Sequence, residues 1–292
     1  MDARQLEYFL AVVDHGGVNR AAQALHIAQP SLSQAIRTLE RDLGSDLFHR
    51  VGRRVVLTPA GQALIEPARQ VARGLATARA SVESTAGLQA GRVEIAAMPS
   101  QAVEPLSSMI RRFTGRYPGL SVAIRVAPTA AVVLELVRTG VTELGLLGTP
   151  GPVTAAGVKL EPAGTQRFVL IAPPDSPFAD GSVVRRDELR GQRLIVGQHG
   201  TGMRQLVDEI LAEGVEFTVV VESEHREAFL PLVLGGVGLA VLTDSWAALA
   251  RQAGAAVAYL EPAAYLHLAL ASRNAPLTPA AVAFLAVARE NV

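Results

Sequence analysis

The segment from Gln29 to Arg37 gathers amide, hydroxyl and guanidinium side chains that can contact nucleic acid. These polar residues are Gln29, Ser31, Ser33, Gln34 and Arg37. Leu32, Ile36 and Leu39 recur in the same segment at helical spacing, which predicts an amphipathic helix with most of the polar residues off its apolar stripe. Such groups near a helix N-terminus reach base edges and phosphates in the major groove of DNA. The alternative is an ordinary helix whose polar face is only solvated.

The flanking residues predict the remainder of a small DNA-binding head. Helices are expected over residues 4–14, 18–25 and 29–43, with Pro30 in the first turn of the third. A basic stretch follows, because Arg50, Arg53 and Arg54 occur where no acidic residue lies between Leu47 and Ile65. We expect a β-hairpin wing there, with its arginines placed to straddle a phosphate backbone or enter a minor groove.

A long helix is predicted from Thr58-Pro59 to about residue 86. Its apolar residues alternate in steps of four and three, as in a coiled coil. They are Leu64, Ala68, Val71, Leu75, Ala78 and Val82. We interpret them as a seam between two copies of the chain, and the alternative is a helix packed on its own domain. Pro67 lies inside this helix and should bend it or weaken its first turns.

Beyond a hinge at Gly87 to Gly91, short strands rich in Val, Ile and Leu alternate with helices, which predicts parallel α/β sheets. The predicted domains are a head at 1–58, a linker helix and hinge at 59–90, and an α/β domain at 91–292. Two βαβ sets divide the last domain into subdomain I, about 91–162 and 266–292, and subdomain II, about 163–265. Ligands of such sheets bind at the carboxyl ends of the strands, in the cleft between the halves.

Composition limits the class of protein. The 292 residues carry 27 basic and 27 acidic side chains, so a general polyanion binder is disfavoured. Residues 1–90 nevertheless hold a small arginine excess, as expected of a basic head on a neutral-to-acidic body. Cysteine is absent, which excludes disulfides, thiolate zinc sites and thiol nucleophiles. No apolar run suits a membrane span and the N-terminus does not read as a signal peptide, so we expect a cytoplasmic protein with no membrane partner.

At this point the chain resembles the LysR-type transcriptional regulators. The stretch LEYFLAVVDHGGVNRAAQALHIAQPSLSQAIRTLERDLGSDLFHRVGRRVVLTPAG is similar to the family's winged helix-turn-helix, and FVLIAPPDSPFA and LVLGGVGLAVL are similar to its effector domain. The resemblance implies an N-terminal winged helix-turn-helix and an effector domain of two α/β subdomains with a periplasmic-binding-protein-like fold. It also implies a homodimer or homotetramer that binds double-stranded DNA at a dyad operator. A small effector would then change its contacts with DNA and RNA polymerase.

The resemblance also assigns residues to the two sites. Base and phosphate contacts fall on Gln29, Pro30, Ser31, Ser33 and Arg37, and wing contacts on Arg50, Arg53 and Arg54. The effector cleft falls at strand ends and helix starts, in residues 99–101, 127–129 and 147–149 and in the segment Gln198 to Gly202. The positions expected to contact the effector are Pro99, Ser100, Gln101, Thr129, Leu147, Gly148, Thr149, His199, Thr201 and Gly202. Ser100 at a helix N-terminus is a candidate seat for a carboxylate. His199 could add a proton-dependent charge, or simply lie in solvent. No cofactor beyond a small effector, with a carboxylate favoured, is expected.

Three other functions are weighed against this interpretation. An enzyme would need a nucleophile with a base or paired carboxylates, and G-x-S-x-G, H-E-x-x-H and phosphate-cradling lysine motifs are all absent from the sequence. We therefore expect no catalysis. A secreted solute receptor is opposed by the first 90 residues. A DNA-binding regulator or architectural protein with no effector response stays open, and would give footprints that no metabolite changes.

Overall fold

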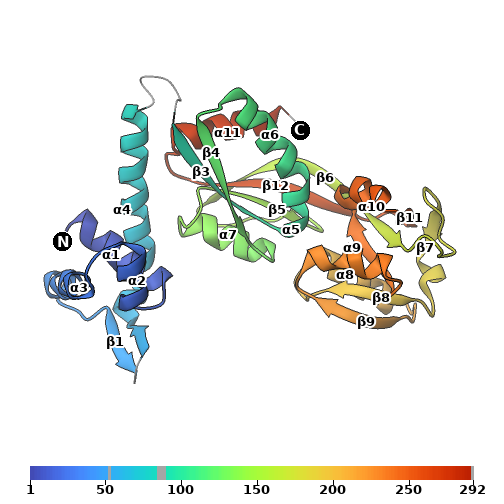
Figure 1. Ribbon diagram of the computed structural model, residues 1–292, viewed down its shortest axis with the longest axis horizontal. Coiled ribbons are helices and arrows are strands. Elements are labelled where there is room, and N and C mark those ends of the chain that lie inside the picture. The colour runs from blue at the N-terminus through green and yellow to red at the C-terminus, as the bar shows by residue number, and fades with distance from the viewer. Residues whose placement is uncertain (52–53, 84–89, 291–292) are drawn as a thin grey trace. The chain divides into compact units, whose positions relative to one another are not determined.

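The computed structural model describes residues 1–51, 54–83 and 90–290 of the chain. Two compact units are present, an N-terminal head with its long helix and an α/β unit, and each is described by itself (Figure 1). The side chains of Arg50, Val51, Arg54 and Glu83 are outside the description, as is Arg53 altogether.

The head contains α1 (Ala3–Asp14), α2 (Val18–Ala24) and α3 (Gln29–Leu43), which confirms the three predicted helices. Asp2 and Gln5 form a capping box that fixes the start of α1. Gly44 ends α3 in the left-handed conformation with φ 68°. The three helices pack around one apolar core, whose largest members include Phe9, Leu32, Leu39 and Leu47. The stripe predicted on α3 is therefore its buried face.

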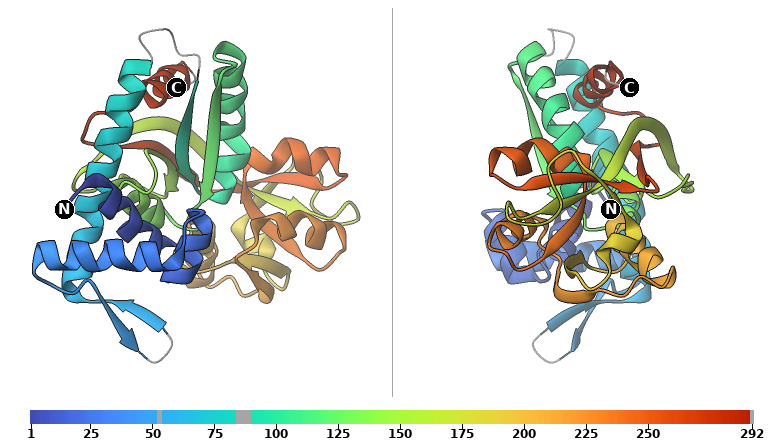
Figure 2. Two further views of the ribbon diagram at one scale, coloured as in Figure 1. Left: turned by 60° about the vertical axis from the view of Figure 1, so that its left-hand side comes forward. Right: turned by 90° about the vertical axis from the view of Figure 1, so that its right-hand side faces the viewer.

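The predicted wing is the antiparallel pair β1 (Phe48–Val51) and β2 (Arg54–Leu57), in which Phe48 pairs with Leu57 and Val51 with Arg54. The hairpin extends away from the helices of the head (Figure 2). Phe48 packs back on the core, where its ring lies 5.4 Å from that of Phe9. This contact anchors the strands while their far end stays clear of the helices.

The long helix α4 (Pro59–Glu83) runs through Pro67 without interruption. In the first half of α4, the predicted seam between two copies of the chain is wrong. Ala68 is fully buried and Leu64 half-buried, and both pack into the core of the head itself. Val71, Leu75, Ala78 and Val82 are exposed, so the part of the seam left for a second copy lies in the second half of α4. The first half of α4 instead packs on its own domain, which was the alternative interpretation.

Subdomain I of the α/β unit is built on the parallel strands β4 (Leu120–Val126), β3 (Gly91–Ala97) and β5 (Leu144–Thr149). The helices α6 (Ser107–Arg116) and α11 (Pro279–Arg289) pack together through Phe113 and Phe284, whose rings lie 5.2 Å apart. The helix α7 (Ala130–Arg138) packs on β5. Figure 1 shows α6 and α11 on one side of these strands and α7 on the other.

Subdomain II is built on β8 (Arg193–Gly197), flanked by β10 (Leu239–Thr243) and the edge strand β9 (Thr218–Ser223). Its helices are α8 (Gly202–Ala212), α9 (Phe229–Leu234) and α10 (Ala247–Gln252). The short β7 (Val183–Arg185) pairs with β11 (Ala256–Glu261). The strands are parallel across β8, so their carboxyl ends and the starts of the helices that follow lie at one edge.

Two long strands join the subdomains into one sheet path. The fifteen-residue β6 (Val158–Ala172) pairs first with β12 (Tyr265–Arg273) and then with β10 and β11. The sequence predicted subdomain borders at 162/163 and 265/266, and both positions fall within these paired strands. The connection is therefore continuous hydrogen-bonded β-structure.

Candidate DNA-binding and effector sites

The polar face of α3 is available for DNA. Burial of Leu32, Ile36 and Leu39 turns the opposite face to solvent, where Arg37 is exposed. The remaining predicted contacts are exposed as well, except the half-buried Ser33: Gln29, Pro30, Ser31 and Gln34. Gln29 Nε2 donates to Ser33 Oγ at 2.7 Å, which links two of these side chains one turn apart. Among the described residues Arg37 has no ion-pair partner, so its guanidinium is free for an external acceptor.

The starts of α2 and α3 offer backbone donors beside that face. Gly17 and Ala28, the residues that precede the two helices, supply no side-chain cap. Uncapped N–H groups at a helix N-terminus bind phosphate oxygens well. The wing adds Arg50 in β1 and Arg54 in β2, whereas Arg53 lies outside the described residues. The site residues expected for DNA contact thus lie on α3 and its hairpin.

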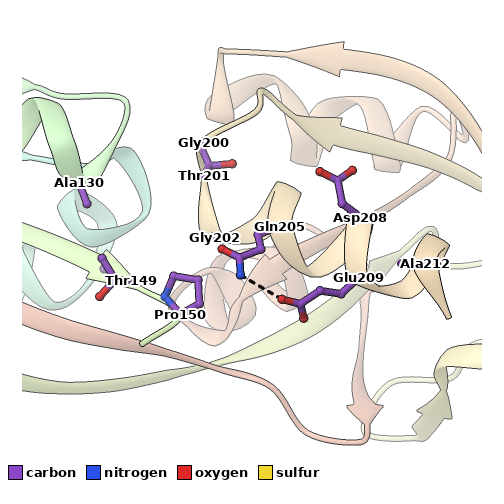
Figure 3. A pocket seen from close by; sticks show the side chains of 11 residues that line it. Ala130, Thr149, Pro150, Gly200, Thr201, Gly202, Gln205, Asp208, Glu209 and Ala212 are labelled. Carbon is purple, nitrogen blue, oxygen red and sulfur yellow. Dashed lines mark hydrogen bonds between the residues drawn. The ribbon is translucent and has the colours of Figure 1, made fainter. Parts of the chain in front are cut away.

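A cavity of about 540 Å³ lies between the two halves of the α/β unit (Figure 3). Ala130, Thr149 and Pro150 line one side, and α8 with the loop before it lines the other. Four of the predicted effector positions are in the lining: Gly148, Thr149, Thr201 and Gly202. Gly200, in the segment Gln198 to Gly202 expected at the cleft, also lines the cavity. The lining residues that were not predicted are Ala130, Pro150, Gln205, Asp208, Glu209 and Ala212. The lining residues on α8 and at its N-cap include positions 201, 205, 208 and 212, and this spacing places them on one face of the helix.

Thr201 shapes the α8 wall. Its hydroxyl donates to the Gln198 carbonyl at 2.9 Å and accepts from the Arg204 N–H at 3.3 Å, which makes it the N-cap of α8. This cap closes the loop and brings the positive end of α8 to the cavity. On the next turns, Glu209 accepts from Gln205 Nε2 at 3.0 Å (Figure 3). The wall thus combines helix-start donors with carboxylate acceptors.

Arg204 on α8 is an arginine whose charge is neutralised by neighbouring carboxylates. Arg204 donates to Asp208 and Glu222, each at 2.8 Å, and to the Gly197 carbonyl at 3.3 Å. The hydrogen bond with Asp208, followed by that with Glu222, raises the pKa of Arg204 despite its burial. The charge of Arg204 is therefore taken up by its own neighbours.

The structure corrects several predicted effector positions. Leu147 is fully buried in an apolar cluster with Met98 and Val133, because residues of a central strand alternate between faces and its face is covered by α7. Ser100 and Gln101 are also buried. Ser100 Oγ accepts from Trp246 Nε1 at 3.4 Å, and Gln101 Nε2 donates to Gln166 Oε1 at 2.9 Å. Trp246 of the other subdomain thus contacts Ser100, the residue that was expected to bind a carboxylate.

The other three positions lie beside the cavity and do not line it. Pro99 is half-buried at the start of the short α5 (Pro99–Gln101). The Thr129 hydroxyl accepts from the Val132 N–H at 3.4 Å near the start of α7. His199 has a side chain that is 70 % exposed, and its Nδ1 lies 3.6 Å from Asp208 Oδ2. The solvated alternative for His199 therefore matches the structure better than a ligand contact.

Comparisons with known proteins decide the family. Residues 3–62 match the model of the bacterial regulatory helix-turn-helix protein, lysR family, and residues 86–292 match that of the LysR substrate binding domain. The chain belongs to the LysR family of transcriptional regulators. It is 30 % identical to the regulator TfdS of Cupriavidus pinatubonensis over 99 % of this chain and 98 % of that protein. It is also 30 % identical to a RuBisCO operon transcriptional regulator of Allochromatium vinosum, over 82 % and 78 % of the two chains.

Solved LysR-type structures share the fold. Full-length OxyR from Pseudomonas aeruginosa matches with a TM-score of 0.76 at 22 % identity, covering 100 % of this chain and 94 % of that one. Full-length CbnR complexed with its target DNA matches with a TM-score of 0.71 at 22 % identity, over 100 % of both chains. The solved structures confirm the predicted fold, and the family models and relatives confirm the role in DNA-binding regulation. No helix in the described parts of this LysR-type chain is both long and apolar enough to cross a membrane.

Proposed function

We propose that this LysR-type regulator binds a dyad operator as a homodimer or homotetramer in the cytoplasm. The supporting observation for the oligomer is the exposed apolar row of Val71, Leu75 and Val82 on α4, since isolated soluble helices rarely leave such a row to solvent. Two copies joined there would present two α3 helices to two half-sites. The curated relatives are regulators, and we propose regulation, with contacts to RNA polymerase, and no catalysis.

We also propose that a small effector occupies the cavity between the subdomains. The observation that carries this proposal is that the lining comes from both subdomains, Thr149 and Pro150 from one and Thr201 to Ala212 from the other. A ligand there contacts both walls at once, so its binding energy depends on their separation. The helix start at Gly202 favours a carboxylate at that end.

The experiment uses the full chain and DNA from the region upstream of the genes next to its own. Operator affinity and footprint length are measured at fixed salt, alone and with a panel of carboxylates, aromatics and amino acids. We expect one chemical class to change the footprint and to raise the melting temperature, because a ligand at about 100 times its dissociation constant adds roughly 2.7 kcal/mol. Footprints that no compound changes would favour the regulator without an effector response.

A further inference from the structure

Arg226 is a buried cation in subdomain II that the cavity does not use. It begins the short helical turn Arg226–Ala228 after β9 and is 4 % exposed. Its guanidinium carbon lies 4.8 Å from the centre of the Phe229 ring. Nη1 lies 2.7 Å from the position that a Cβ on Gly197 would take. The guanidinium is thus close both to an aromatic ring and to the backbone at the carboxyl end of β8.

No acceptor in the described parts of the chain satisfies this guanidinium. Nε and Nη1 are buried without a hydrogen-bond partner, and Nη2 is the nitrogen that solvent reaches. Burial lowers the pKa of Arg226 to about 10, so the group stays charged at neutral pH. Glu227 is the acid beside it in sequence, but the Glu227 side chain is 76 % exposed and pairs with His225 at 3.3 Å.

Arg204 lies near the same end of β8, but unlike Arg226 it has carboxylate partners. Both arginines lie beside Gly197: Arg204 donates to its carbonyl, and Nη1 of Arg226 lies close to where a Cβ on Gly197 would be. Arg204 has Asp208 and Glu222 as partners, while Arg226 has no counter-charge within hydrogen-bond distance among the described residues. A buried charge without a partner is strongly unfavourable, so an anion that accepted from the guanidinium at Nη2 would bind with a large gain.

We propose that Arg226 binds an oxyanion, the carboxylate, sulfate or phosphate group of a small ligand, at the carboxyl end of β8. The planar guanidinium matches such groups, and its exposed Nη2 gives the anion an approach. Gly197 leads directly into the loop that ends at the cavity lining residues Gly200 and Thr201. Only the assignment of this anion to the effector rests on the proposed function, because Arg226 itself does not line the cavity.

The test follows thermal unfolding of the full chain with sodium sulfate, sodium phosphate or sodium acetate, at an ionic strength held constant with sodium chloride. The wild type should show a saturable rise in melting temperature with at least one of these anions. Arg226→Met keeps the apolar stem on Phe229 and removes the charge, so its apparent dissociation constant should rise at least tenfold. Without anion, Arg226→Met should melt at or above the wild-type temperature, because an uncompensated charge has been removed.

Two further variants sharpen the result. Arg190→Gln removes an exposed arginine of the same subdomain and should leave the anion response unchanged. Gly197→Ala places a methyl group against Nη1 and should weaken the anion response while keeping the arginine, which decides the question if Arg226→Met fails to fold. An anion response equal in wild type, Arg226→Met and Gly197→Ala would overturn the proposal.

Two other outcomes would also overturn it. If Arg226→Met folds but melts well below the wild type in chloride alone, the charge is already compensated within the chain. If Arg226→Met instead dissociates the oligomer in sedimentation, a carboxylate of a second copy is the partner. Operator binding is measured in parallel, and an effector response that survives in Arg226→Met would leave the proposed function standing while showing that the effector does not use this anion site.

Discussion

Arg37→Ala should weaken specific operator binding without destabilising the head. The Arg37 side chain is exposed on the face of α3 opposite Leu32, Ile36 and Leu39, and it has no ion-pair partner among the described residues. Its removal should therefore change the free energy of unfolding by no more than about 0.5 kcal/mol. A guanidinium that contacts a base edge contributes about 1–3 kcal/mol of discrimination, equivalent to about 5- to 150-fold in the dissociation constant.

The assay is fluorescence anisotropy on operator and scrambled DNA at one fixed salt concentration. Arg41→Ala is the matched control, because Arg41 is an exposed arginine of the same helix, about 6 Å farther from the N-terminus that enters the groove. Arg37→Lys separates the two kinds of contact, since lysine keeps a phosphate contact but loses a bidentate base contact. Unchanged operator affinity in Arg37→Ala, or an equal loss in Arg41→Ala, would refute the assignment of Arg37 to the DNA-binding face.

Three more variants test other parts of the chain. Leu75→Glu puts a charge into the exposed row of α4 and should shift the oligomer toward monomer in sedimentation without lowering the melting temperature of the head; an intact oligomer would contradict the shortened seam. Thr201→Ala removes the N-cap of α8 and should cost about 1 kcal/mol in denaturant unfolding while leaving DNA affinity unchanged without effector. The hydrogen bond from Arg289, then that from Lys159, lowers the pKa of Glu161 from 4.5 to about 2, so its stabilisation is present above pH 4.5 and lost as the pH falls through 2. Glu161→Gln should therefore destabilise the domain by about 1–3 kcal/mol at neutral pH and converge with the wild type in acid, with Glu290→Gln as the exposed control.

Local signals in the sequence were sufficient to predict the helices of the head and the buried face of α3. The stripe of Leu32, Ile36 and Leu39 fixes which face of α3 is buried, and the polar face follows by exclusion. Gly44 ends the helix in a conformation that favours glycine. The heptad on α4 could not show where the head stops covering it. Ala68 is small enough to seat against the head core and equally suited to a helix seam, so only packing distinguishes the two.

The effector site depends on contacts between distant segments, and sequence spacing does not report these. Ser100 occupies a helix start, as the resemblance implied, but Trp246 from the other subdomain reaches its hydroxyl. Leu147 immediately precedes lining residues, yet it faces the opposite side of β5. The α8 wall could have been found, because its lining residues share one helical face with the predicted Thr201.

A contact beside the cavity shows why the arrangement of its two walls could not be predicted from any one segment. Gly148 in subdomain I and Gly202 in subdomain II both approach the side chain of Leu266 on β12, and a Cβ on either glycine would lie 2.4 Å from it. Leu266 is 3 % exposed and belongs to a strand that crosses between the subdomains. The side chain of Leu266 is therefore close to one lining residue from each wall. We expect that a change in the distance between Gly148 and Gly202 would require this leucine to repack, because buried side chains are closely packed.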